Sequence, residues 1–488
     1  MLLVGVLVSV ARGQVAVPST STWTTQSPLL PEFDWVVVDH AGGDSFSVYN
    51  TVGDDAVYAV GLMQRIVNLT NVVTGEWVAS VDETNDQDLY IAKISLDGKP
   101  LAIWTYPTTS GAAWTLSDAP ADDDYDYTYP DDLTYADGYL AICGFFAGNI
   151  TFGENVLITS DSNGAAQQAY VAKISSTDGT AVWARTVRGR VPDGTSSAYR
   201  ANFNVDGAVG IAGNKCNADW DACSAYVQLF DKDTGDTIWE KDLGSSIYLH
   251  HGFAVGPANT YYASGAVRAK TTIDGVDLDP GNASEHGLLI ALDSNATARW
   301  AVTIAPEDGY EGRSEAYDVR VVDDAAYIQC WGGTKEVRST ASSVTMAFEG
   351  LYDNGGIAKI GLDGVPLWVA DVPTWGYTVT ATSDAVYHCF PHIDDPMYEY
   401  VYGDTKFTNW GASGTNDAYV AKLDAATGKG VWILQTGGVG DESWEQNCVA
   451  DPQSGDLFYT GSLYSHPAYY DPLVVDTHSV DDGNDVVI

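Results

Sequence analysis

One short segment recurs through the chain, and its spacing limits the folds that the chain can adopt. The segment AYVAKLDAATGKGVW at Ala418–Trp432 returns as AYVAKISSTDGTAVW at Ala169–Trp183 and as AYVQLFDKDTGDTIW at Ala225–Trp239. Weaker copies lie at 89–104, 287–300 and 355–368. A repeat with such a period is typical of an array of similar structural units that bury a continuous core between neighbours.

Every copy ends at a tryptophan, and seven such tryptophans are spaced by 56 to 79 residues. That length holds about four short strands with their turns, which is the content of one propeller blade. The first tryptophan has no strand-like segment before it, whereas the last residues, 485–488, resemble the start of AYVAK with nothing after it. We predict that these residues pack neighbouring blades together: Trp35, Trp104, Trp183, Trp239, Trp300, Trp368 and Trp432.

The residue pattern of each copy predicts two strands joined by a tight turn. In Tyr419–Leu423 apolar residues alternate with small or polar ones, which is the pattern of a half-buried strand. Thr427-Gly428 then reverses the chain, because glycine adopts the positive φ that tight turns require. Trp432 begins the next strand and supplies a large apolar surface between sheets. The sequence therefore predicts an all-β protein.

The pattern A-Y-V-A-K-x-D-x-x-T-G-x-x-x-W resembles the repeat of PQQ-like (quinoprotein-type) propellers and of bacterial-type seven-bladed propellers. The resemblance covers residues 33–488 and implies a seven-bladed β-propeller of four-stranded blades, with strand C before the turn and strand D, the outermost, after it. Phe33–Asp39 would then be a strand D that joins strands A, B and C of the last blade, drawn from Glu442–Ile488, and closes the ring. The B–C loops are long, for example 62–87 and 145–167, so their face is the expected interaction surface.

The N-terminus predicts a secreted, extracellular protein, and the net charge limits its partners. Residues 1–13 have the apolar core and small residues of a signal peptide, without a basic start, and residues 14–31 form a leader rich in Ser, Thr and Pro. The propeller is expected over residues 32–488. The chain has 23 Lys and Arg against 66 Asp and Glu, and the net charge of −43 disfavours nucleic acid as a partner. No segment is long and apolar enough to predict a membrane span.

Six cysteines fit an oxidising compartment. Cys216 and Cys223 lie seven positions apart in a short polar loop, so we predict a disulfide between them. The other four fall in apolar, strand-like runs, and the sequence leaves open whether they form bridges or stay as buried thiols. These four are Cys143, Cys330, Cys389 and Cys448.

Four N-x-S/T sequons predict N-linked glycans, as expected for a secreted chain. Three fall in predicted B–C loops and the fourth in a C–D turn, so the glycans would lie on opposite faces. The acceptors are Asn68, Asn149, Asn282 and Asn295.

Two acidic clusters are candidate calcium sites, because calcium takes six to eight oxygen ligands. A plain solvated acidic surface is the alternative, and no other cofactor is expected. The candidate ligands are Asp122, Asp124 and Asp126 in one cluster, which also holds Asp123, Asp131 and Asp132, and Asp277 and Asp279 in the other.

Histidines offer weaker metal candidates. His388 and Cys389 are successive residues of a predicted strand, with His392 three positions on, and His250-His251 are also adjacent. Successive strand residues point to opposite faces, which favours core or rim histidines over a shared metal.

No pattern of a nucleophile, a phosphate loop or a metalloprotease is present, so we predict that the chain is not an enzyme. For quinone-dependent dehydrogenases, the resemblance implies eight blades, two adjacent cysteines and a metal-bound quinone, and this chain has seven tryptophan units and no Cys-Cys pair. We expect an interaction or structural module of an extracellular assembly, a role that the resemblance to algal cell-surface and flagellar-hair propellers permits. Its partners would be other extracellular proteins, copies of itself, or glycans. A carbohydrate-binding, lectin-like propeller is the main alternative.

Overall fold

The fold is seen in a computed structural model of the chain. The structure describes residues 7–10, 33–39, 46–63, 66–71, 74–81, 88–109, 128–153, 156–160, 167–191, 194–217, 222–281, 284–306, 313–332, 334–348, 355–372, 376, 378–393, 400–402, 405–407, 416–436, 447–460, 468–470, 473–475 and 486–487. These residues form antiparallel strands and one short 3₁₀ turn, η2 (Pro257–Asn259). The predicted all-β propeller class is confirmed.

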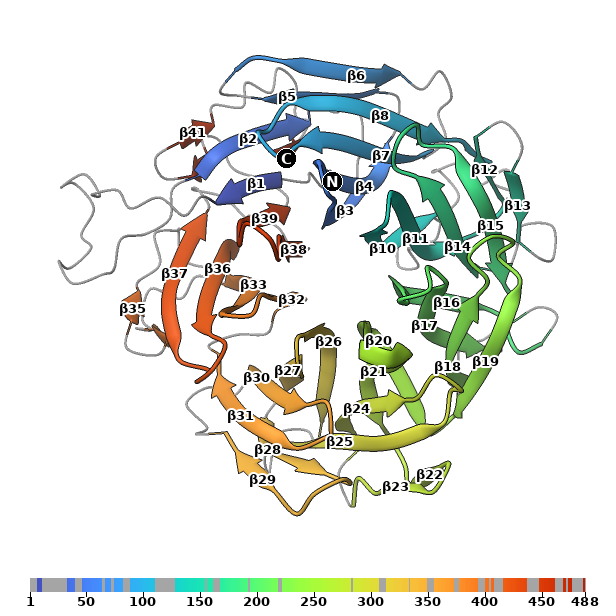
Figure 1. Cartoon of the computed structure of the whole chain (residues 1–488), viewed down its shortest axis with the longest axis vertical. Helices are drawn as coiled ribbons and strands as arrows, with labels where there is room; N and C mark the ends of the chain where they lie inside the picture. The colour runs from blue at the N-terminus through green and yellow to red at the C-terminus, as the bar shows by residue number, and fades with distance from the viewer. Residues whose placement is uncertain are drawn as a thin grey trace.

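Within the described residues, seven sheets of four or more strands follow one another around a common axis (Figure 1). Blade 1 holds β3 (Phe46–Val52), β4 (Ala56–Met63), β7 (Asp88–Ser95) and β8 (Pro100–Tyr106); blade 2 holds β10 (Tyr129–Ala136), β11 (Tyr139–Phe146), β14 (Gln168–Ser175) and β15 (Ala181–Val187). Blade 3 holds β16 (Ser196–Phe203), β17 (Val209–Cys216), β18 (Cys223–Phe230) and β19 (Thr237–Gly244); blade 4 holds β20 (Ile247–Gly256), β21 (Thr260–Val267), β24 (His286–Leu292) and β25 (Ala298–Pro306). Blade 5 holds β26 (Ser314–Val322), β27 (Ala325–Gly332), β30 (Gly355–Gly361) and β31 (Pro366–Asp371); blade 6 holds β32 (Thr378–Ala381), β33 (Ala385–Ile393), β36 (Asn416–Asp424) and β37 (Gly430–Thr436).

Blade 7 corrects the prediction of how the ring is completed. Its order is β38 (Asn447–Ala450), β39 (Leu457–Thr460), β1 (Leu7–Val10) and β2 (Phe33–Asp39), so the strand in the third place comes from the N-terminal residues. The register of β1 on β2 is that of the repeat. Ser9 lies opposite Trp35, as Lys422 lies opposite Trp432 in blade 6. The C-terminal strand β42 (Val486–Val487) pairs with β2 farther along, opposite Val38 and Asp39. β1 lies inside the predicted signal peptide, whose cleavage stays a prediction.

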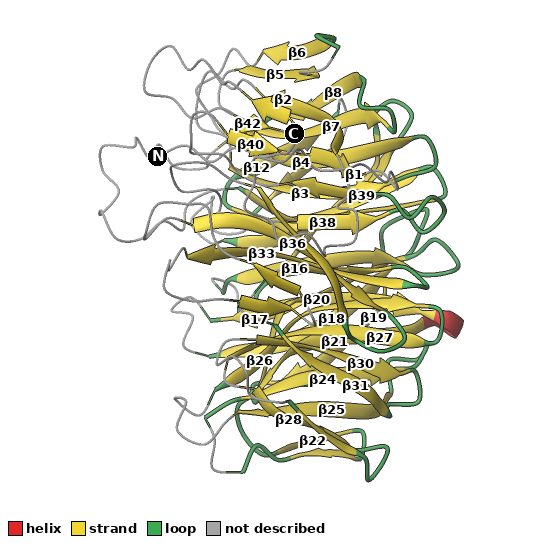
Figure 2. Ribbon diagram, turned by 90° about the vertical axis from the view of Figure 1, so that its left-hand side faces the viewer, coloured by secondary structure: helices red, strands yellow, loops and turns green. Residues whose placement is uncertain are grey.

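Five of the long B–C loops contain a hairpin of their own. These hairpins are β5–β6 (Ile66–Asn71, Trp77–Val81), β12–β13 (Asn149–Phe152, Val156–Thr159), β22–β23 (Thr271–Ile273, Val276–Leu278), β28–β29 (Thr334–Ser339, Thr345–Ala347) and β34–β35 (Tyr400–Tyr402, Thr405–Phe407). Two of them extend the sheet of the preceding blade, since β5 pairs with β2 and β28 with β25. A third hairpin also contacts the preceding blade, since β12 pairs with β9 (Thr108–Thr109), which follows β8. A further hairpin is formed by β40 (Ala468–Tyr470) and β41 (Leu473–Val475). The short turns between strands gather on the opposite face, with η2 among them (Figure 2).

At several junctions the tryptophan at the end of the repeat contacts the next blade. Trp183 Nε1 and Lys173 Nζ of blade 2 both donate hydrogen bonds to the carbonyl of Lys232 in blade 3, at 3.2 and 3.0 Å. Gly235, with φ +70°, lies against the Trp183 ring so closely that a Cβ atom there would come within 2.6 Å of it. The repeated Lys, Gly and Trp therefore form a single contact between neighbouring blades, rather than serving each strand separately.

The same contact recurs at other blades. Trp368 Nε1 and Lys359 Nζ of blade 5 both donate to the carbonyl of Ala425 in blade 6, at 3.1 and 3.0 Å. Trp183, Trp300 and Trp368 are buried, Trp104, Trp239 and Trp432 are half-buried, and the side chain of Trp35 in β2 lies outside the described residues.

Candidate functional site

Five of the described inner strands carry a bulge near the end that faces the B–C loops, and those of the consecutive blades 3, 4 and 5 form the candidate site. The register shifts between Ala198 and Arg200 in β16, between Leu249 and Gly252 in β20, and between Ala316 and Asp318 in β26. A bulge leaves its extra residues outside the ladder and redirects their side chains. The residues left outside are Tyr199, His250, His251 and Tyr317, and each is only partly buried.

These bulged residues bring aromatic rings of three consecutive blades together. The rings of His250 and His251 both stack on Tyr317, with centroids 5.2 Å apart in each case. Tyr199 lies 5.2 Å from His251. The expectation that the two histidines point to opposite faces was wrong, because alternation holds for a regular strand and both residues lie in a bulge.

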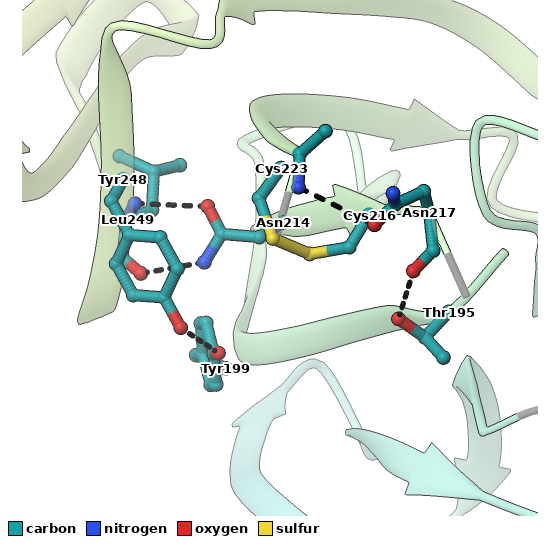
Figure 3. Close-up of a disulfide and its surroundings, with 9 residues drawn as sticks. Thr195, Tyr199, Asn214, Cys216, Asn217, Cys223, Tyr248 and Leu249 are labelled. Atoms are coloured by element: carbon teal, nitrogen blue, oxygen red, sulfur yellow. Dashed lines mark hydrogen bonds between the residues drawn. A yellow bond between two sulfur atoms is a disulfide. The ribbon is translucent and has the colours of Figure 1, made fainter. Parts of the chain in front are cut away.

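Blade 3 holds the bulge of β20 in place, as Figure 3 shows. The buried side chain of Asn214 donates to the carbonyl of Leu249 at 2.9 Å and accepts from the Leu249 N–H at 3.0 Å. The hydroxyls of Tyr199 and Tyr248 are 3.1 Å apart. Asn214 lies two residues before Cys216 on β17, so this clamp and the neighbouring disulfide belong to one end of the same strand.

A cluster of charged residues lies next to the rings. We call Arg268, Glu285, Arg313 and Glu315, together with His250, the Glu–Arg cluster. Arg268 Nε is 2.5 Å from one oxygen of Glu285, and Arg313 Nε is 2.9 Å from the other. A terminal nitrogen of Arg313 is 3.1 Å from Glu315 Oε1, and His250 Nε2 is 3.2 Å from Glu315 Oε2.

The two arginines of the cluster reach the surface, and the two carboxyl groups do not. The side chains of Arg268 and Arg313 are each 41% exposed, against 9% for Glu285 and 4% for Glu315. Arg268 stacks over the ring of Tyr248 and Arg313 over that of Trp331, at 4.4 and 5.9 Å from the ring centres. The cluster therefore offers guanidinium groups and rings to solvent and keeps its acids beneath them.

Burial and the neighbouring charges separate the pKa values of the two carboxyl groups. Burial raises the pKa of Glu315 to about 7, and its hydrogen bond with Glu285 acts in the same direction. Burial alone would raise the pKa of Glu285 as well, but Arg268 and Arg313 outweigh it and the pKa is lowered. Burial lowers the pKa of His250 to about 3, helped by the positive charge of Arg268 and Arg313. At neutral pH His250 is therefore uncharged, Glu285 is ionised, and Glu315 is close to half-protonated.

A second, fully buried ion group lies beneath the bulges. The Arg200 guanidinium is 2.7 Å from Asp132 of blade 2 and 3.4 Å from Asp318 of blade 5, and its Nε donates to the carbonyl of His251. Asp132 accepts from the N–H of Ala201 and Asp318 from that of Val379, at 3.0 and 3.1 Å. This group connects the inner strands of blades 2, 3, 4, 5 and 6 and stabilises the backbone that carries the aromatic rings.

The cysteines are now assigned. Cys216 and Cys223, opposite each other in β17 and β18, form the disulfide that their spacing predicts. Cys389 of blade 6 is bonded to Cys448 of blade 7, which removes Cys389 as a metal ligand beside His388. Cys143 and Cys330 are free and buried, and burial raises the pKa of both thiols.

The candidate calcium ligands are not brought together where they are described. Asp277 accepts from the hydroxyl of Thr272, and Asp279 is 2.6 Å from Lys270 Nζ. Asp131 and Asp132 belong to the buried inner strand β10 rather than to a solvated cluster. Asp122, Asp123, Asp124 and Asp126 lie outside the described residues, so calcium there stays a prediction. In the described part of the chain no group of three or more His, Cys, Asp or Glu could hold a metal ion.

Three of the four sequon asparagines lie within the described residues, in the kinds of segment that the sequence predicts. Asn149 begins strand β12 and Asn68 lies within strand β5, both in the hairpins of B–C loops. Asn295 is exposed in a C–D turn, whereas Asn282 lies outside the described residues. Glycosylation of the four sites stays a prediction.

Sequence reasoning missed the cluster for a physical reason. Glu285 and Glu315 come from different blades, and only the ring places them side by side. One signal was present: Ser196–Arg200 reads SSAYR and Ser314–Asp318 reads SEAYD, so a second repeated segment marks the bulged end of the inner strand. Ser196 and Ser314 also make the same contacts, each donating to the carbonyl of the preceding strand D.

Comparisons with known proteins find no family for this chain and a distant similarity to solved structures. No protein family matches the sequence, and no curated protein matches it. A solved structure of quinohemoprotein alcohol dehydrogenase from Comamonas testosteroni is similar at a TM-score of 0.39 and 10% identity, over 86% of this chain and 76% of that one. Rhamnogalacturonan lyase YesW is similar at a TM-score of 0.32 and 12% identity, over 86% of this chain and 73% of that one.

These comparisons correct the prediction that the chain is not an enzyme, because both similar structures are enzymes. At these identities and TM-scores, neither assigns a reaction to this chain. Among the described residues no helix is long and apolar enough to cross a membrane. The two disulfides fit a protein of an oxidising compartment.

Proposed function

We propose that this chain is an extracellular propeller that binds carbohydrate where the inner strands of blades 3, 4 and 5 meet the B–C loops. The proposal is carried by one observation: partly exposed rings and hydrogen-bonding charged groups converge there from three consecutive blades. Aromatic rings offer apolar faces, and arginine and carboxyl groups supply the directional hydrogen bonds that fix a polar ligand. A sugar presents both kinds of surface, CH faces and hydroxyl groups.

The surroundings of the site support a preformed binding surface. The Arg200 group and the Asn214 clamp hold the bulges from below and from the side, so little ordering remains to be done on binding. Other extracellular proteins or copies of the chain stay predictions as further partners.

The test is binding of a broad set of oligosaccharides to the secreted protein, measured on an array and then by calorimetry. Arg268→Ala should lower the affinity of any bound sugar at least about tenfold. The matched control is Arg299→Ala, since Arg299 is likewise an arginine paired with a carboxylate, but near a C–D turn and 3.5 Å from Asp293. Absence of sugar binding, or equal loss in both variants, would reject the proposal.

A second candidate function is acid–base catalysis on the bound ligand. The observation that favours it is the pair Glu285 and Glu315, whose pKa values are moved apart beneath the two arginines. Glu315 would be the proton donor near neutral pH. Sugars that bind should then be incubated with the protein and with Glu315→Gln, and product formation lost in the variant would support catalysis.

A further inference from the structure

The hairpin β5–β6, at the outer edge of the blade 7 sheet, repeats the turn that joins strands C and D of a blade (Figure 1). Its residues 71–77 read NVVTGEW, and residues 231–239 of blade 3 read DKDTGDTIW. In both turns the threonine N–H donates to the side chain of the first residue at 2.9 Å. The glycine N–H donates to the carbonyl of that residue, at 2.8 Å in the hairpin and 2.9 Å in blade 3. Gly75 and Gly235 also share a left-handed backbone, with φ +72° and +70°.

The turn glycines of blades 2, 3, 5 and 6 each receive a tryptophan ring from the preceding blade. A Cβ added at Gly235 would come within 2.6 Å of the Trp183 ring, and one at Gly428 within 2.7 Å of the Trp368 ring. A Cβ added at Gly75 would meet no atom within 4 Å. The hairpin therefore presents the receiving half of the contact between blades, and no ring of the described residues lies over it.

The same hairpin also presents a ring of its own. Trp77 is 66% exposed, and it is the one described tryptophan whose side chain is exposed. Its register position is that of Thr237 in blade 3, whose cross-strand partner Phe230 lies 6.0 Å from the ring of Trp183. Side chains of cross-strand partners share a face of the sheet, so this position lies on the face that receives the ring. We therefore expect Trp77 and the open side of Gly75 to lie next to each other on one face.

The surface around the hairpin carries little charge. Residues 66–81 contain one charged side chain, Glu76, which is 3.1 Å from Lys99 Nζ of blade 1. In β8, which contacts β6, Leu101 is also exposed. Two chains with a net charge of −43 repel each other, and a neutral, partly apolar surface is where that repulsion is weakest.

We infer that the β5–β6 hairpin is a docking surface for a second copy of this chain. Trp77 of each copy would lie over the Gly75 turn of the other, so that one self-complementary patch forms a twofold contact. A second copy fits because the contact needs a tryptophan ring and a turn glycine, and this chain presents both side by side. The contact is small, so we expect a reversible dimer with a dissociation constant of about 1 to 100 µM. The inference does not depend on the proposed carbohydrate site.

The experiment is sedimentation velocity of the secreted protein over concentrations that bracket this dissociation constant. Trp77→Ala should weaken the dimer at least about tenfold, because a buried aromatic anchor dominates a small interface. Gly75→Ala should weaken it as well, since the new Cβ meets no atom of its own chain and would occupy the position of the partner's ring.

Hairpin β12–β13 supplies a matched control for each variant. Leu157 in β13 is 62% exposed, and Gly153 has φ +66° with no atom within 4 Å of an added Cβ. The turn after β12 reads GENV and lacks the threonine–glycine pair. Leu157→Ala and Gly153→Ala should therefore leave the dimer unchanged.

Two changes of condition separate the tryptophan contact from other ways of joining two copies. Added salt should strengthen the dimer, because it screens the repulsion between acidic chains, whereas a dimer held by ion pairs would weaken. Enzymatic removal of N-linked sugars should leave the dimer intact, whereas a contact made by a glycan at the predicted acceptor Asn68 would be lost. A monomer at every concentration, a dimer that survives in Trp77→Ala, or an equal loss in the control variants would overturn the inference. Weakening by salt or loss with the sugars would overturn it too, and none of these results bears on the carbohydrate site.

Discussion

Two neighbouring blade junctions arise from the same repeat and are held together differently. At the junction of blades 2 and 3, Lys173 and Trp183 share one carbonyl acceptor, and Gly235 lies flat on the Trp183 ring. At the junction of blades 3 and 4, Leu229 stands in the place of the lysine opposite Trp239. Ala296, with φ +60°, replaces the turn glycine in blade 4, and the buried Nε1 of Trp239 has no hydrogen-bond partner among the described residues.

The junction that has lost the repeated contact carries one part of the candidate site, the contacts of Tyr199 with Tyr248 and His251. There the Asn214 clamp and the Tyr199–Tyr248 contact connect the two blades instead, close to the bulges of the inner strands. The Glu–Arg cluster itself lies between blades 4 and 5, where Trp300 Nε1 still donates to the carbonyl of Leu362 at 3.1 Å. The loss of the repeated contact at the junction of blades 3 and 4 therefore goes with the Asn214 clamp, not with the cluster.

The largest expected effect is at the regular junction. Gly235→Ala forces a Cβ into the Trp183 ring and places an L side chain at φ +70°, so we expect a loss of about 3 kcal/mol in the free energy of unfolding. Denaturant unfolding with tryptophan fluorescence measures it.

The matched control for this substitution is Gly207→Ala. Gly207 also has positive φ, but a Cβ there would lie no closer than 3.8 Å to Lys232, so only the backbone cost of about 1 kcal/mol is expected. Equal losses in the two variants would show that the ring contact contributes nothing.

The irregular junction should depend on its clamp in turn. Asn214→Ala leaves the N–H and the carbonyl of the buried Leu249 without partners, and we expect a loss of about 2 to 3 kcal/mol. The half-exposed Asn202 of β16 is the control position, where replacement by alanine should cost less than about 0.5 kcal/mol. If Asn214→Ala loses no more unfolding free energy than the Asn202 control, the hydrogen bonds of Asn214 do not stabilise this junction.

The free energy of unfolding should also change with pH, through Glu315 of blade 5. The folded pKa of Glu315, about 7, lies above its ordinary value of 4.5, so its contribution is complete below pH 4.5 and is lost as the pH rises through 7. The difference in unfolding free energy between the native protein and Glu315→Gln should therefore shift by about 3 kcal/mol from pH 4.5 to 8. His250 and His251, with pKa values lowered to about 3, lose stability only as the pH falls below 6.5, and they do so in both proteins.

Unfolding scans at several pH values give this difference directly. Glu240→Gln is a suitable second reference, because Glu240 is 38% exposed and is paired with Lys215 away from the Glu–Arg cluster. A flat difference between native protein and Glu315→Gln would contradict the protonated state of Glu315.

Local sequence was sufficient for the blades and insufficient for the site. The strand alternation, the turn glycines and the Cys216–Cys223 clip are encoded within a few residues of one another, so their pattern can be read directly. The bulge that brings His250 and His251 to one ring depends on the register with the neighbouring strand, which strand periodicity does not encode. The Cys389–Cys448 bond and the Glu285–Glu315 pair join residues of different blades, and only the packing of the blades selects those partners.

The smallest expected effect separates the two tryptophans themselves. Replacing either by phenylalanine removes similar volume, but Trp183→Phe also removes a hydrogen bond to Lys232, whereas Trp239→Phe removes a buried N–H that has no acceptor among the described residues. Trp183→Phe should therefore be the more destabilising change by about 1 kcal/mol, since a buried donor without a partner is itself unfavourable. Thermal unfolding of both variants under one set of conditions measures the difference. If Trp239→Phe proves equally or more destabilising, the contact of Trp239 with Tyr261, at 5.1 Å between ring centres, contributes more than the shared carbonyl does at the regular junction.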